Sequence, residues 1–148
     1  LYIFFKSDKR NITNYEIKEE SMSPALLPDD YVLAIKNKEP LSRGDIVVFK
    51  NHEKNIDVVK RIIGLPGETV GSENGRVLIN DIEIDDIWAK TLTDDFIPQT
   101  LGDEEVFVLG DQRRLSSSDS RTLGPIPIQE CWKLKYRYWP YQRFKAYE

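Results

Sequence analysis

The sequence predicts a mostly β protein whose antiparallel strands form a coiled barrel or sandwich. Short runs rich in Val, Ile and aromatic residues recur along the chain, and Gly-, Pro- and Asn-containing turns separate them. No amphipathic pattern exceeds two helical turns. At 148 residues the chain is expected to form a single domain, residues 1–148.

The predicted strands are closely spaced. They are expected at residues 15–18, 30–36, 45–50, 56–64, 76–80, 82–84, 105–110 and 131–139. Asn80 and Asp81 tolerate positive φ, so they predict a tight hairpin between two of these strands.

The last predicted strand alternates apolar and basic residues, which predicts one packed face and one solvated face. Residues 133–145 contain five basic residues and no acidic one, with aromatic residues between them. A surface that faces lipid headgroups is therefore a second interpretation of this region.

Two segments do not fit the strand pattern. Residues 84–103 are acidic and without a period, and we expect them to form an inserted lid or flap. Residues 1–6, LYIFFK, are far shorter than the ~20 residues that cross a bilayer. They are interpreted either as the outer end of an N-terminal transmembrane helix or as a short terminal strand.

Composition argues against several classes of function. A net charge of −4 disfavours a dedicated nucleic-acid binder. Cys131 is the only cysteine, which rules out an intrachain disulfide or a thiolate metal cluster and is typical of a buried apolar side chain. His52 is the only histidine, so a zinc site and a Ser-His-Asp triad are poorly supported. We expect neither a metal nor a cofactor.

One strand carries an unexpected lysine. In IDVVKRIIG, residues 56–64, Lys60 shares a face with Val58 and Ile62. Burial among aliphatic groups lowers the pKa of a lysine and makes it a usable general base, whereas arginine keeps its proton. A lone lysine in such a strand more often reaches water or pairs with a carboxylate, so the pattern alone leaves both interpretations open.

A serine offers this lysine a partner. Ser21 in ESMSP stands before an apolar turn marked by proline, where a hydroxyl can be held exposed. A neutral lysine within hydrogen-bond distance could deprotonate it, as in Ser-Lys variants of the serine nucleophile. Ser23 would point the opposite way on an extended chain, and we interpret it as a turn residue.

Four blocks together resemble the type I signal peptidases. SMSPALLPDDYVL, RGDIVVF, VVKRIIGLPGE and LGDQRRLSSSDSR occur in that family's order, and KYRYWP is similar to its final strand. The resemblance covers nearly the whole chain. It implies the family's mostly β fold with a small inserted lid, and a serine endopeptidase that removes signal peptides from exported precursor proteins. It also implies a catalytic domain on the extracytoplasmic side of the cell membrane, anchored in lipid by a single N-terminal helix.

The resemblance assigns roles by position. Ser21 matches the nucleophile and Lys60 the general base. In S-x-D-S-R, Ser117 matches the serine whose hydroxyl orients the lysine, and Asp119 and Arg121 match residues that buttress the site. The neighbouring Ser116, Ser118 and Ser120 are interpreted as solvated loop residues.

Further positions follow the same blocks. Asp111 and Arg113 match the G-D-x-R positions and are interpreted as structural support, although an ordinary ion pair of Asp111 with Arg121 is an alternative. Met22 and Pro24 flank the nucleophile and are expected to contact substrate.

Three departures from the family pattern stand out. Glu19 replaces the usual Gly or Ser two positions before the nucleophile, where a carboxylate would oppose the negative charge of the transition state. Ala25 replaces a Thr, and one extra residue lies between Arg113 and Ser117. The inserted lid is also short, so the chain is interpreted as a specialised or reduced member.

Two alternatives remain open. One is a signal-peptidase-like assembly factor that binds exported subunits, such as pilins, while a pilus or surface fibre is built. The other is a self-cleaving repressor or mutagenesis protein with a related Ser-Lys fold, which the S-x-D-S-R block and the LYIFFK start disfavour.

Overall fold

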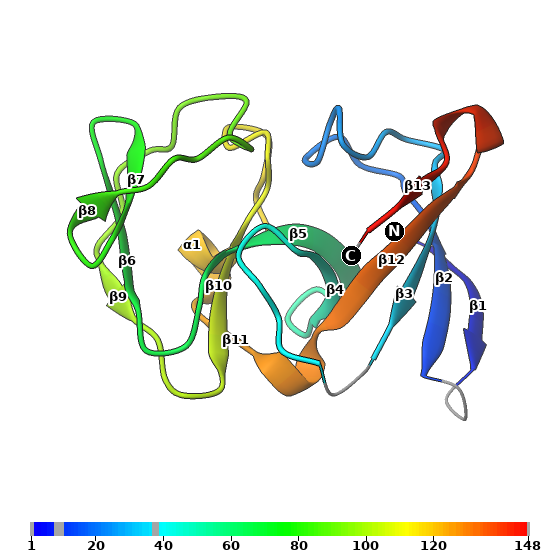
Figure 1. Cartoon of the computed structure of the whole chain (residues 1–148), viewed down its shortest axis with the longest axis horizontal. Helices are drawn as coiled ribbons and strands as arrows, with labels where there is room; N and C mark the ends of the chain where they lie inside the picture. Colours follow the sequence, from blue (N-terminus) through cyan, green and yellow to red (C-terminus); the bar gives the residue numbers. More distant parts are fainter. Residues whose placement is uncertain (1, 8–10, 37–38, 148) are drawn as a thin grey trace.

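The protein is a two-sheet β structure, seen in a computed structural model that describes residues 2–7, 11–36 and 39–147, with side chains from residue 11 onward. Within these residues the strands form a nine-stranded sheet and a four-stranded sheet (Figure 1). Neighbouring strands in both sheets pair antiparallel. The mostly β fold class predicted from the sequence is confirmed.

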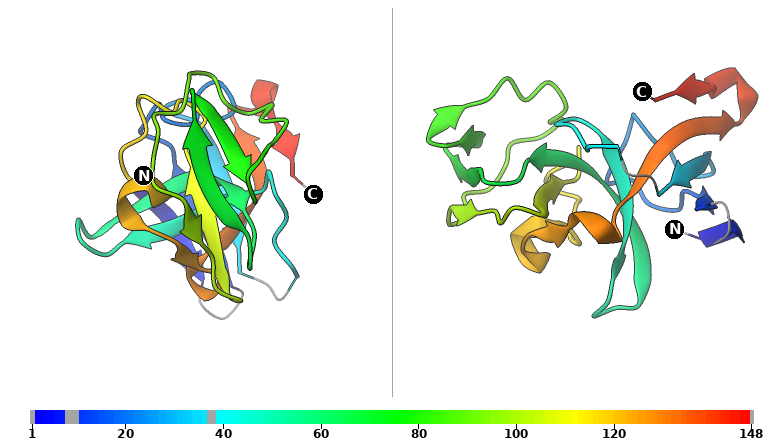
Figure 2. Two further views of the ribbon diagram at one scale, coloured as in Figure 1. Left: turned by 90° about the vertical axis from the view of Figure 1, so that its left-hand side faces the viewer. Right: turned by 60° about the horizontal axis from the view of Figure 1, so that its bottom comes forward.

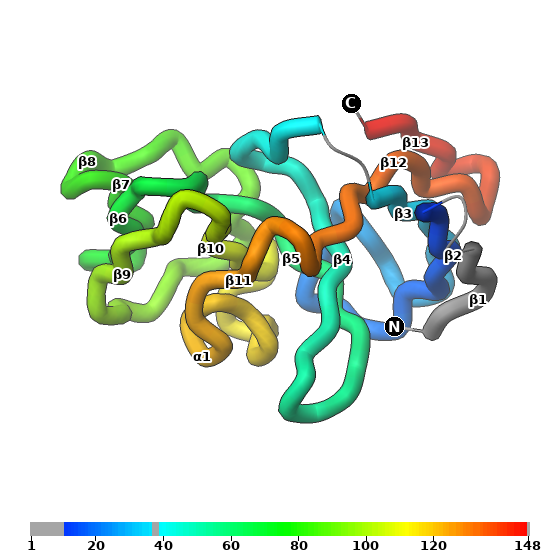
Figure 3. Tube along the Cα trace, turned by 90° about the horizontal axis from the view of Figure 1, so that it is seen from below, coloured from blue at the N-terminus to red at the C-terminus, as the bar shows by residue number. Residues whose placement is uncertain are grey.

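The large sheet curls, as Figures 1 and 2 show, and holds most of the chain. Its order is β1 (Tyr2–Ser7), β2 (Ile12–Glu16), β3 (Tyr31–Ile35), β12 (Trp132–Trp139), β4 (Ile46–Asn51), β5 (Ile56–Gly64), β10 (Glu105–Leu109) and β11 (Ile126–Pro127), with β13 (Lys145–Ala146) beside β12. The β4–β5 hairpin projects from the body of the molecule (Figure 3).

The small sheet lies on the left of Figure 1, away from β1, β2 and β3. Its order is β8 (Ile82–Glu83), β7 (Arg76–Ile79), β6 (Thr69–Glu73) and β9 (Gln99–Thr100). Asn80 and Asp81 have φ of 51° and 67° and join Ile79 to its partner Ile82, so the predicted hairpin is confirmed. Strand β6 was missed because its sequence, TVGSE, has little apolar character.

Helical structure is minimal in the described chain. It consists of α1 (Ser120–Leu123) and two single 3₁₀ turns, η1 (Ile128–Glu130) and η2 (Tyr141–Arg143). None of the described helices has the length and apolar character needed to span a bilayer. Tyr2–Ser7 forms strand β1, in line with the terminal-strand interpretation, while a preceding membrane helix stays a prediction.

Strand β5 is held on both faces by the hydrophobic core. Val59 packs in a cluster with residues of β2, β3 and β4, and Val58 and Ile62 pack in a second cluster with β10. Ile63 belongs to a third cluster, shared with the small sheet. Lys60, in the middle of this strand, therefore lies in a rigid apolar frame.

The predicted alternation of β12 is wrong in part. Lys133 is only 8% exposed and pairs with Asp45 at 3.6 Å, whereas Tyr136 is 41% exposed. The pairing of β12 with β3 shifts register twice, after Leu134 and after Arg137, and each shift interrupts the period of two. The basic face is thus not simply solvated.

The segment expected to be a lid packs against the small sheet. The hydroxyl of Ser72 donates to the carbonyl of Asp94 at 2.7 Å and accepts from the N–H of Phe96 at 3.0 Å. The Phe96 ring stacks on Phe107 with centroids 5.2 Å apart. Residues 84–98 contain no strand, and β9 then returns the chain to the sheet. That this segment opens and closes as a lid stays a prediction.

Candidate active site

Ser21, in the connection between β2 and β3, meets Lys60 on strand β5. The Nζ atom of Lys60 donates a hydrogen bond of 2.8 Å to the Oγ atom of Ser21. Ser21 is 5% exposed and Lys60 is 1% exposed, so this contact is almost wholly shielded from solvent. The two residues that the sequence singled out are therefore in direct contact.

A compact turn presents Ser21. The N–H of Ser23 donates to the carbonyl of Glu20 at 3.0 Å, and that of Leu26 donates to Met22 at 2.9 Å. Met22 and Leu26 are 1% and 0% exposed and anchor the turn in the core. The N–H of Ser21 itself has no hydrogen-bond acceptor in the part of the chain that the structure describes.

Gln112 holds this turn from the other side of the site. Its backbone N–H donates to the carbonyl of Ser21, and its side-chain Nε2 donates to the carbonyl of Ser23, both at 2.9 Å. Gln112 occupies the variable position of G-D-x-R, so the motif does not mark it as a functional residue. Only its place in the three-dimensional structure identifies it.

The surroundings of Lys60 favour the neutral amine. Burial lowers the pKa of the Lys60 ammonium below its ordinary value. The negative charges of Asp119 and Glu19 oppose this by raising the pKa, whereas the charge of Arg121 lowers it. Desolvation outweighs the nearby carboxylates, so the pKa of Lys60 stays below that of a lysine in water.

Asp119 forms the hub of the S-x-D-S-R loop. It is 1% exposed and accepts from Arg121 Nε at 3.0 Å, Arg121 Nη2 at 2.8 Å and the Ser116 hydroxyl at 2.6 Å. Burial raises the pKa of the Asp119 carboxyl, but these hydrogen bonds outweigh it and the net pKa lies below the ordinary range. Asp119 is therefore an anion held beside the lysine.

The serines of this loop differ in their surroundings. Ser117 is exposed and lines the same pocket as Ser21 and Lys60, but among the described residues its hydroxyl makes no hydrogen bond to Lys60. Ser118 is buried, and its Oγ accepts from Asn51 Nδ2 at 3.3 Å, which ties this loop to the β4–β5 hairpin. The orienting role expected of Ser117 stays a prediction.

Ser120, the second serine of S-x-D-S-R, has a structural contact rather than a solvated side chain. It is fully buried and its Oγ accepts from the N–H of Val108 at 2.9 Å. The interpretation of Ser118 and Ser120 as solvated loop residues is therefore wrong, because both are buried and the Ser120 hydroxyl fixes α1 against β10.

Asp111 pairs with Arg61, not with Arg121. Arg61 Nε and Nη2 donate to its two carboxylate oxygens at 2.9 and 2.7 Å, and Asp111 is 1% exposed. Arg61 also donates to the carbonyl of Gly44 and lies over the ring of Trp88. Because Arg61 follows Lys60 directly, this pair fixes the strand that carries the lysine.

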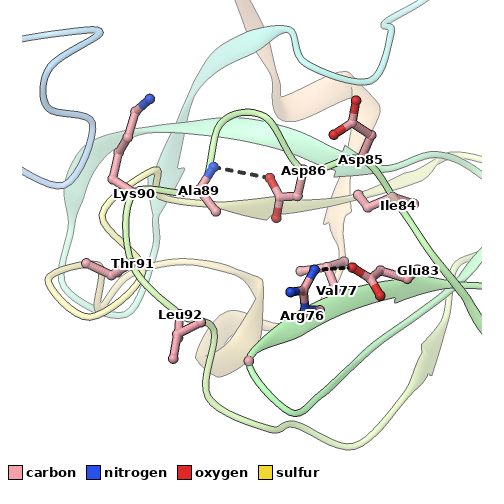
Figure 4. A pocket seen from close by; sticks show the side chains of 11 residues that line it. Arg76, Val77, Glu83, Ile84, Asp85, Asp86, Ala89, Lys90, Thr91 and Leu92 are labelled. Carbon is pink, nitrogen blue, oxygen red and sulfur yellow. Dashed lines mark hydrogen bonds and ion pairs between the residues drawn. The ribbon is translucent and has the colours of Figure 1, made fainter.

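Arg113 anchors the 84–98 segment to the loop between β10 and α1. Its side chain is fully buried, and it donates to Asp86 at 2.7 and 3.0 Å and to the Thr93 hydroxyl at 2.9 Å. Figure 4 shows Asp86 also accepting from the N–H of Ala89, at 3.2 Å. The structural support expected of Arg113 thus takes the form of a clamp between two segments.

A pocket of about 460 Å³ opens over the Ser21–Lys60 pair. It is lined by Glu19, Glu20, Ser21, Lys54, Ile56, Lys60, Leu115, Ser117 and Ser118. Of the two residues expected to contact substrate, Pro24 is exposed, whereas Met22 is buried in the core and does not line this pocket. Their roles in substrate binding stay predictions.

A second cavity, of about 770 Å³, lies over the small sheet between Arg76, Glu83 and the 84–92 segment (Figure 4). It contains neither Ser21 nor Lys60. Within the described residues no group of three or more His, Cys, Asp or Glu side chains is placed to hold a metal ion. Burial raises the pKa of the Cys131 thiol to about 12, which keeps it protonated and unreactive.

Comparison with known proteins links this geometry to one family. The family described as signal peptidase, peptidase S26, matches residues 5–139. Signal peptidase I of Bacillus caldolyticus is 34% identical over 151 residues, covering 89% of this chain and 82% of that protein. Signal peptidase I of Leptolyngbya laminosa is 36% identical over 140 residues, covering 86% and 68% respectively.

A solved structure agrees with the sequence relatives. The crystal structure of a signal peptidase I from Enterococcus faecalis V583 matches with a TM-score of 0.55 at 30% sequence identity. The match covers 65% of this chain and 96% of that chain. The fold type and the resemblance inferred from the four sequence blocks are both confirmed.

Proposed function

The chain belongs to the signal peptidase I family, peptidase S26, and we propose that it cleaves with Ser21 as nucleophile and Lys60 as general base. It is a serine endopeptidase that removes signal peptides from exported precursor proteins. One observation supports the two roles above all others: the 2.8 Å hydrogen bond between Lys60 and Ser21, in a setting where burial lowers the pKa of the lysine.

Acylation begins with a proton transfer inside this contact. With Lys60 neutral, the Ser21 hydroxyl donates to Nζ, and as Oγ attacks the scissile carbonyl the proton passes to the amine. The resulting Lys60 ammonium then gives the proton to the departing amine of the mature protein. An acyl-enzyme on Ser21 remains, and a water that Lys60 deprotonates hydrolyses it.

The developing oxyanion needs a donor, and the free N–H of Ser21 is the candidate. Glu19 lines the same pocket. Its carboxylate is negative, whereas an oxyanion is stabilised by positive charge and by hydrogen-bond donors. We expect this carboxylate to reduce the rate of acylation, so the enzyme works despite Glu19 rather than through it.

The supporting residues act on the pair from both flanks. Asp119, held by Arg121 and Ser116, sets the local charge beside Lys60. The pair of Arg61 with Asp111 fixes the strand of the lysine, since it clamps the adjacent residue. These contacts support structural roles for Asp111, Asp119 and Arg121.

The substrates are exported precursors, and pilin subunits are a narrower possibility. The relatives described above are peptidases, so the alternative of a pilus assembly factor gains no support from them, nor does that of a self-cleaving repressor. Pilin subunits stay a prediction that no contact in this structure favours.

We further propose that the domain works on the extracytoplasmic side of the membrane and touches lipid through an aromatic cluster. Four exposed rings gather around β12 and η2, with Tyr136 stacked on Phe144 and Trp139 edge-on to Tyr141. Aromatic side chains with nearby cations are typical of the membrane–water interface.

The basic residues in this region offer less free positive charge to lipid headgroups than their number implies. Lys133 pairs with Asp45, Arg143 pairs with Asp30, and Arg137 donates to backbone carbonyls. The double substitution W139A/F144A is expected to weaken sedimentation of the chain with anionic vesicles. Equal sedimentation of the variant and the parent would contradict a lipid-facing role for the cluster.

The proposed dyad is tested by cleavage of a precursor peptide that has alanine before the scissile bond. Ser21→Ala and Lys60→Ala are each expected to abolish cleavage, because Ser21 and Lys60 are the one serine–lysine pair of the described pocket whose side chains are hydrogen-bonded to each other. Ser23→Ala is the matched control, a hydroxyl two residues from the nucleophile, and is expected to cleave. Activity in Ser21→Ala or Lys60→Ala would refute the dyad.

A further inference from the structure

The C-terminal segment lies against the turn that carries the nucleophile. Residues 140–147 follow β12, and they lie beyond residues 5–139, which match the family. Figure 1 shows η2 and β13 in red beside β12 at the edge of the molecule where the blue β2–β3 connection also runs. The contacts of this segment therefore lie outside the part of the chain that the family match covers.

Arg143 makes the principal contact. Its Nε and Nη2 atoms donate to the two carboxylate oxygens of Asp30 at 3.0 and 2.9 Å. Asp30 is 2% exposed, and no other cation pairs with it in the described chain. A bidentate pair of this kind fixes direction as well as distance, which a single lysine ammonium cannot do.

Asp30 closes a turn at residues 27–30, in the same β2–β3 connection that carries Ser21. Its carboxylate accepts from the N–H of Leu27 at 2.8 Å, and its backbone N–H donates to the carbonyl of Leu27 at 3.0 Å. Its carbonyl accepts from Ile17, at the other end of the β2–β3 connection. Movement of Asp30 would thus be passed to the whole segment between Ile17 and Asp30.

Two further contacts reach residues close to the nucleophile. Arg143 Nη2 donates to the carbonyl of Pro24 at 3.4 Å, and Arg137 Nη1 donates to the carbonyl of Ala25. Arg137 Nε donates to the carbonyl of Arg143, so the two arginines form one unit. The turn is bound by these arginines on one side and by Gln112 on the other.

We propose that Arg143 is a positioning residue for the reaction: from the C-terminal segment it holds the Ser21 turn so that Oγ stays aligned with Lys60 Nζ. The inference rests on the proposed function, because it takes Ser21 as the nucleophile. Loss of Arg143 leaves the Asp30 carboxylate buried without its cation and frees the carbonyl of Pro24. The turn then relaxes away from the lysine and acylation slows. The pocket residues outside this turn, which include Ile56, Leu115 and Ser117, keep their places, and neither Arg143 nor Asp30 lines the pocket.

Steady-state kinetics of Arg143→Gln and Arg143→Lys test the proposal. Arg143→Gln is expected to lower kcat about 10-fold with KM within about 2-fold of the parent, since small misplacements of reacting groups are costly. The kcat of Arg143→Lys should lie between those of the parent and Arg143→Gln, because lysine keeps the positive charge but loses the second hydrogen bond to Asp30. The matched control is Arg76→Gln, which breaks the exposed pair with Glu83 and is expected to keep both constants.

A double variant separates positioning from general loss of stability. Asp30→Asn in the Arg143→Gln background removes the unpaired buried carboxylate and should restore thermal stability, while kcat stays low because the turn remains unclamped. An unchanged kcat in folded Arg143→Gln, or a kcat that recovers in step with stability in the double variant, would overturn the proposal. Should Arg143→Gln not fold, Arg143→Lys and the double variant decide by the same criteria.

The failure of this inference differs from failure of the proposed function. If Ser21→Ala or Lys60→Ala cleaves, the proposed dyad is wrong whatever Arg143 does. If both are inactive and Arg143→Gln retains the parent kcat, only the positioning role is wrong.

Discussion

Lys60 Nζ lies 2.8 Å from Ser21 Oγ, although the two residues are 39 positions apart in the chain. Strand β5 supplies the lysine from the centre of the core, and a turn anchored by Met22 and Leu26 supplies the serine. A lysine in this position is costly to the fold, because burial opposes its charged form. The site therefore sets the stability of the fold against the chemistry of the lysine.

Replacing the lysine should stabilise the protein while it abolishes activity. Because the pKa of Lys60 is lower in the folded than in the unfolded state, protonated Lys60 destabilises the fold below its folded pKa. Lys60→Met should raise the free energy of unfolding at neutral pH on the order of 1 kcal/mol, a usual size for one substitution. The gain should shrink as pH rises toward the ~10.4 of an unfolded lysine.

Urea denaturation of the parent and Lys60→Met at several pH values measures this difference. A variant less stable than the parent at neutral pH would contradict the view that desolvation dominates at Lys60.

Removing the Glu19 charge should shift the pH profile to the acid side. Glu19 raises the pKa of Lys60, so Glu19→Gln is expected to lower that pKa and move the rising limb of kcat/KM to lower pH. A higher kcat should accompany the shift, since the carboxylate no longer opposes the oxyanion. Glu20→Gln is the matched control, because Glu20 lines the same pocket but is not among the charges that shift the pKa of Lys60. The rising limb of kcat/KM in Glu20→Gln should therefore stay at the pH of the parent.

Gln112 should affect turnover more than binding. Gln112→Ala loses the 2.9 Å hydrogen bond to the carbonyl of Ser23 but keeps the backbone bond to Ser21. We expect kcat to fall about 10-fold with little change in KM, because the turn is held less firmly. Gln129→Ala, an exposed glutamine in η1, serves as the control. Equal kcat in the two variants would show that Gln112 has no positioning role.

Gly110 leaves space that the site needs. A Cβ at this position would collide with Ser116 and lie 3.1 Å from the carbonyl oxygen of Ser21. Gly110→Ala should therefore displace the Ser116 hydroxyl from Asp119 and cost about 1–3 kcal/mol of stability. Gly102→Ala is the control for adding a methyl group, because its φ is not positive and a Cβ there would meet only the flexible end of the Glu105 side chain, at 3.0 Å. Thermal unfolding and cleavage rate of both variants provide the comparison.

Much of the fold, and the pairing of Ser21 with Lys60, could be predicted from the sequence. Alternation and turn residues predicted eight strands, and Asn80 and Asp81 fixed one hairpin, because these signals depend only on neighbours in the chain. Lys60 stood out as a charge in an apolar strand, and Ser21 became its expected partner once the four blocks were taken together.

The remaining features depend on partners distant in sequence. Arg143 is 113 positions from Asp30, and Lys133 is buried because Asp45 neutralises it. A linear pattern shows only a run of cations there, and it predicted a solvated face. Gln112 was missed for the same reason, since its role exists only when two loops are brought together.

The most direct test of the account is the pKa of Lys60 itself, measured by NMR titration of the ¹³C-labelled Cε atom in the parent chain, with Lys60→Met used to assign the signal. The account predicts a midpoint below the ~10.4 of a lysine in water, coinciding with the midpoint of the rising limb of kcat/KM. A Lys60 that titrates at its ordinary value, or at a pH unrelated to the kinetic midpoint, would contradict the claim that its neutral amine is the general base.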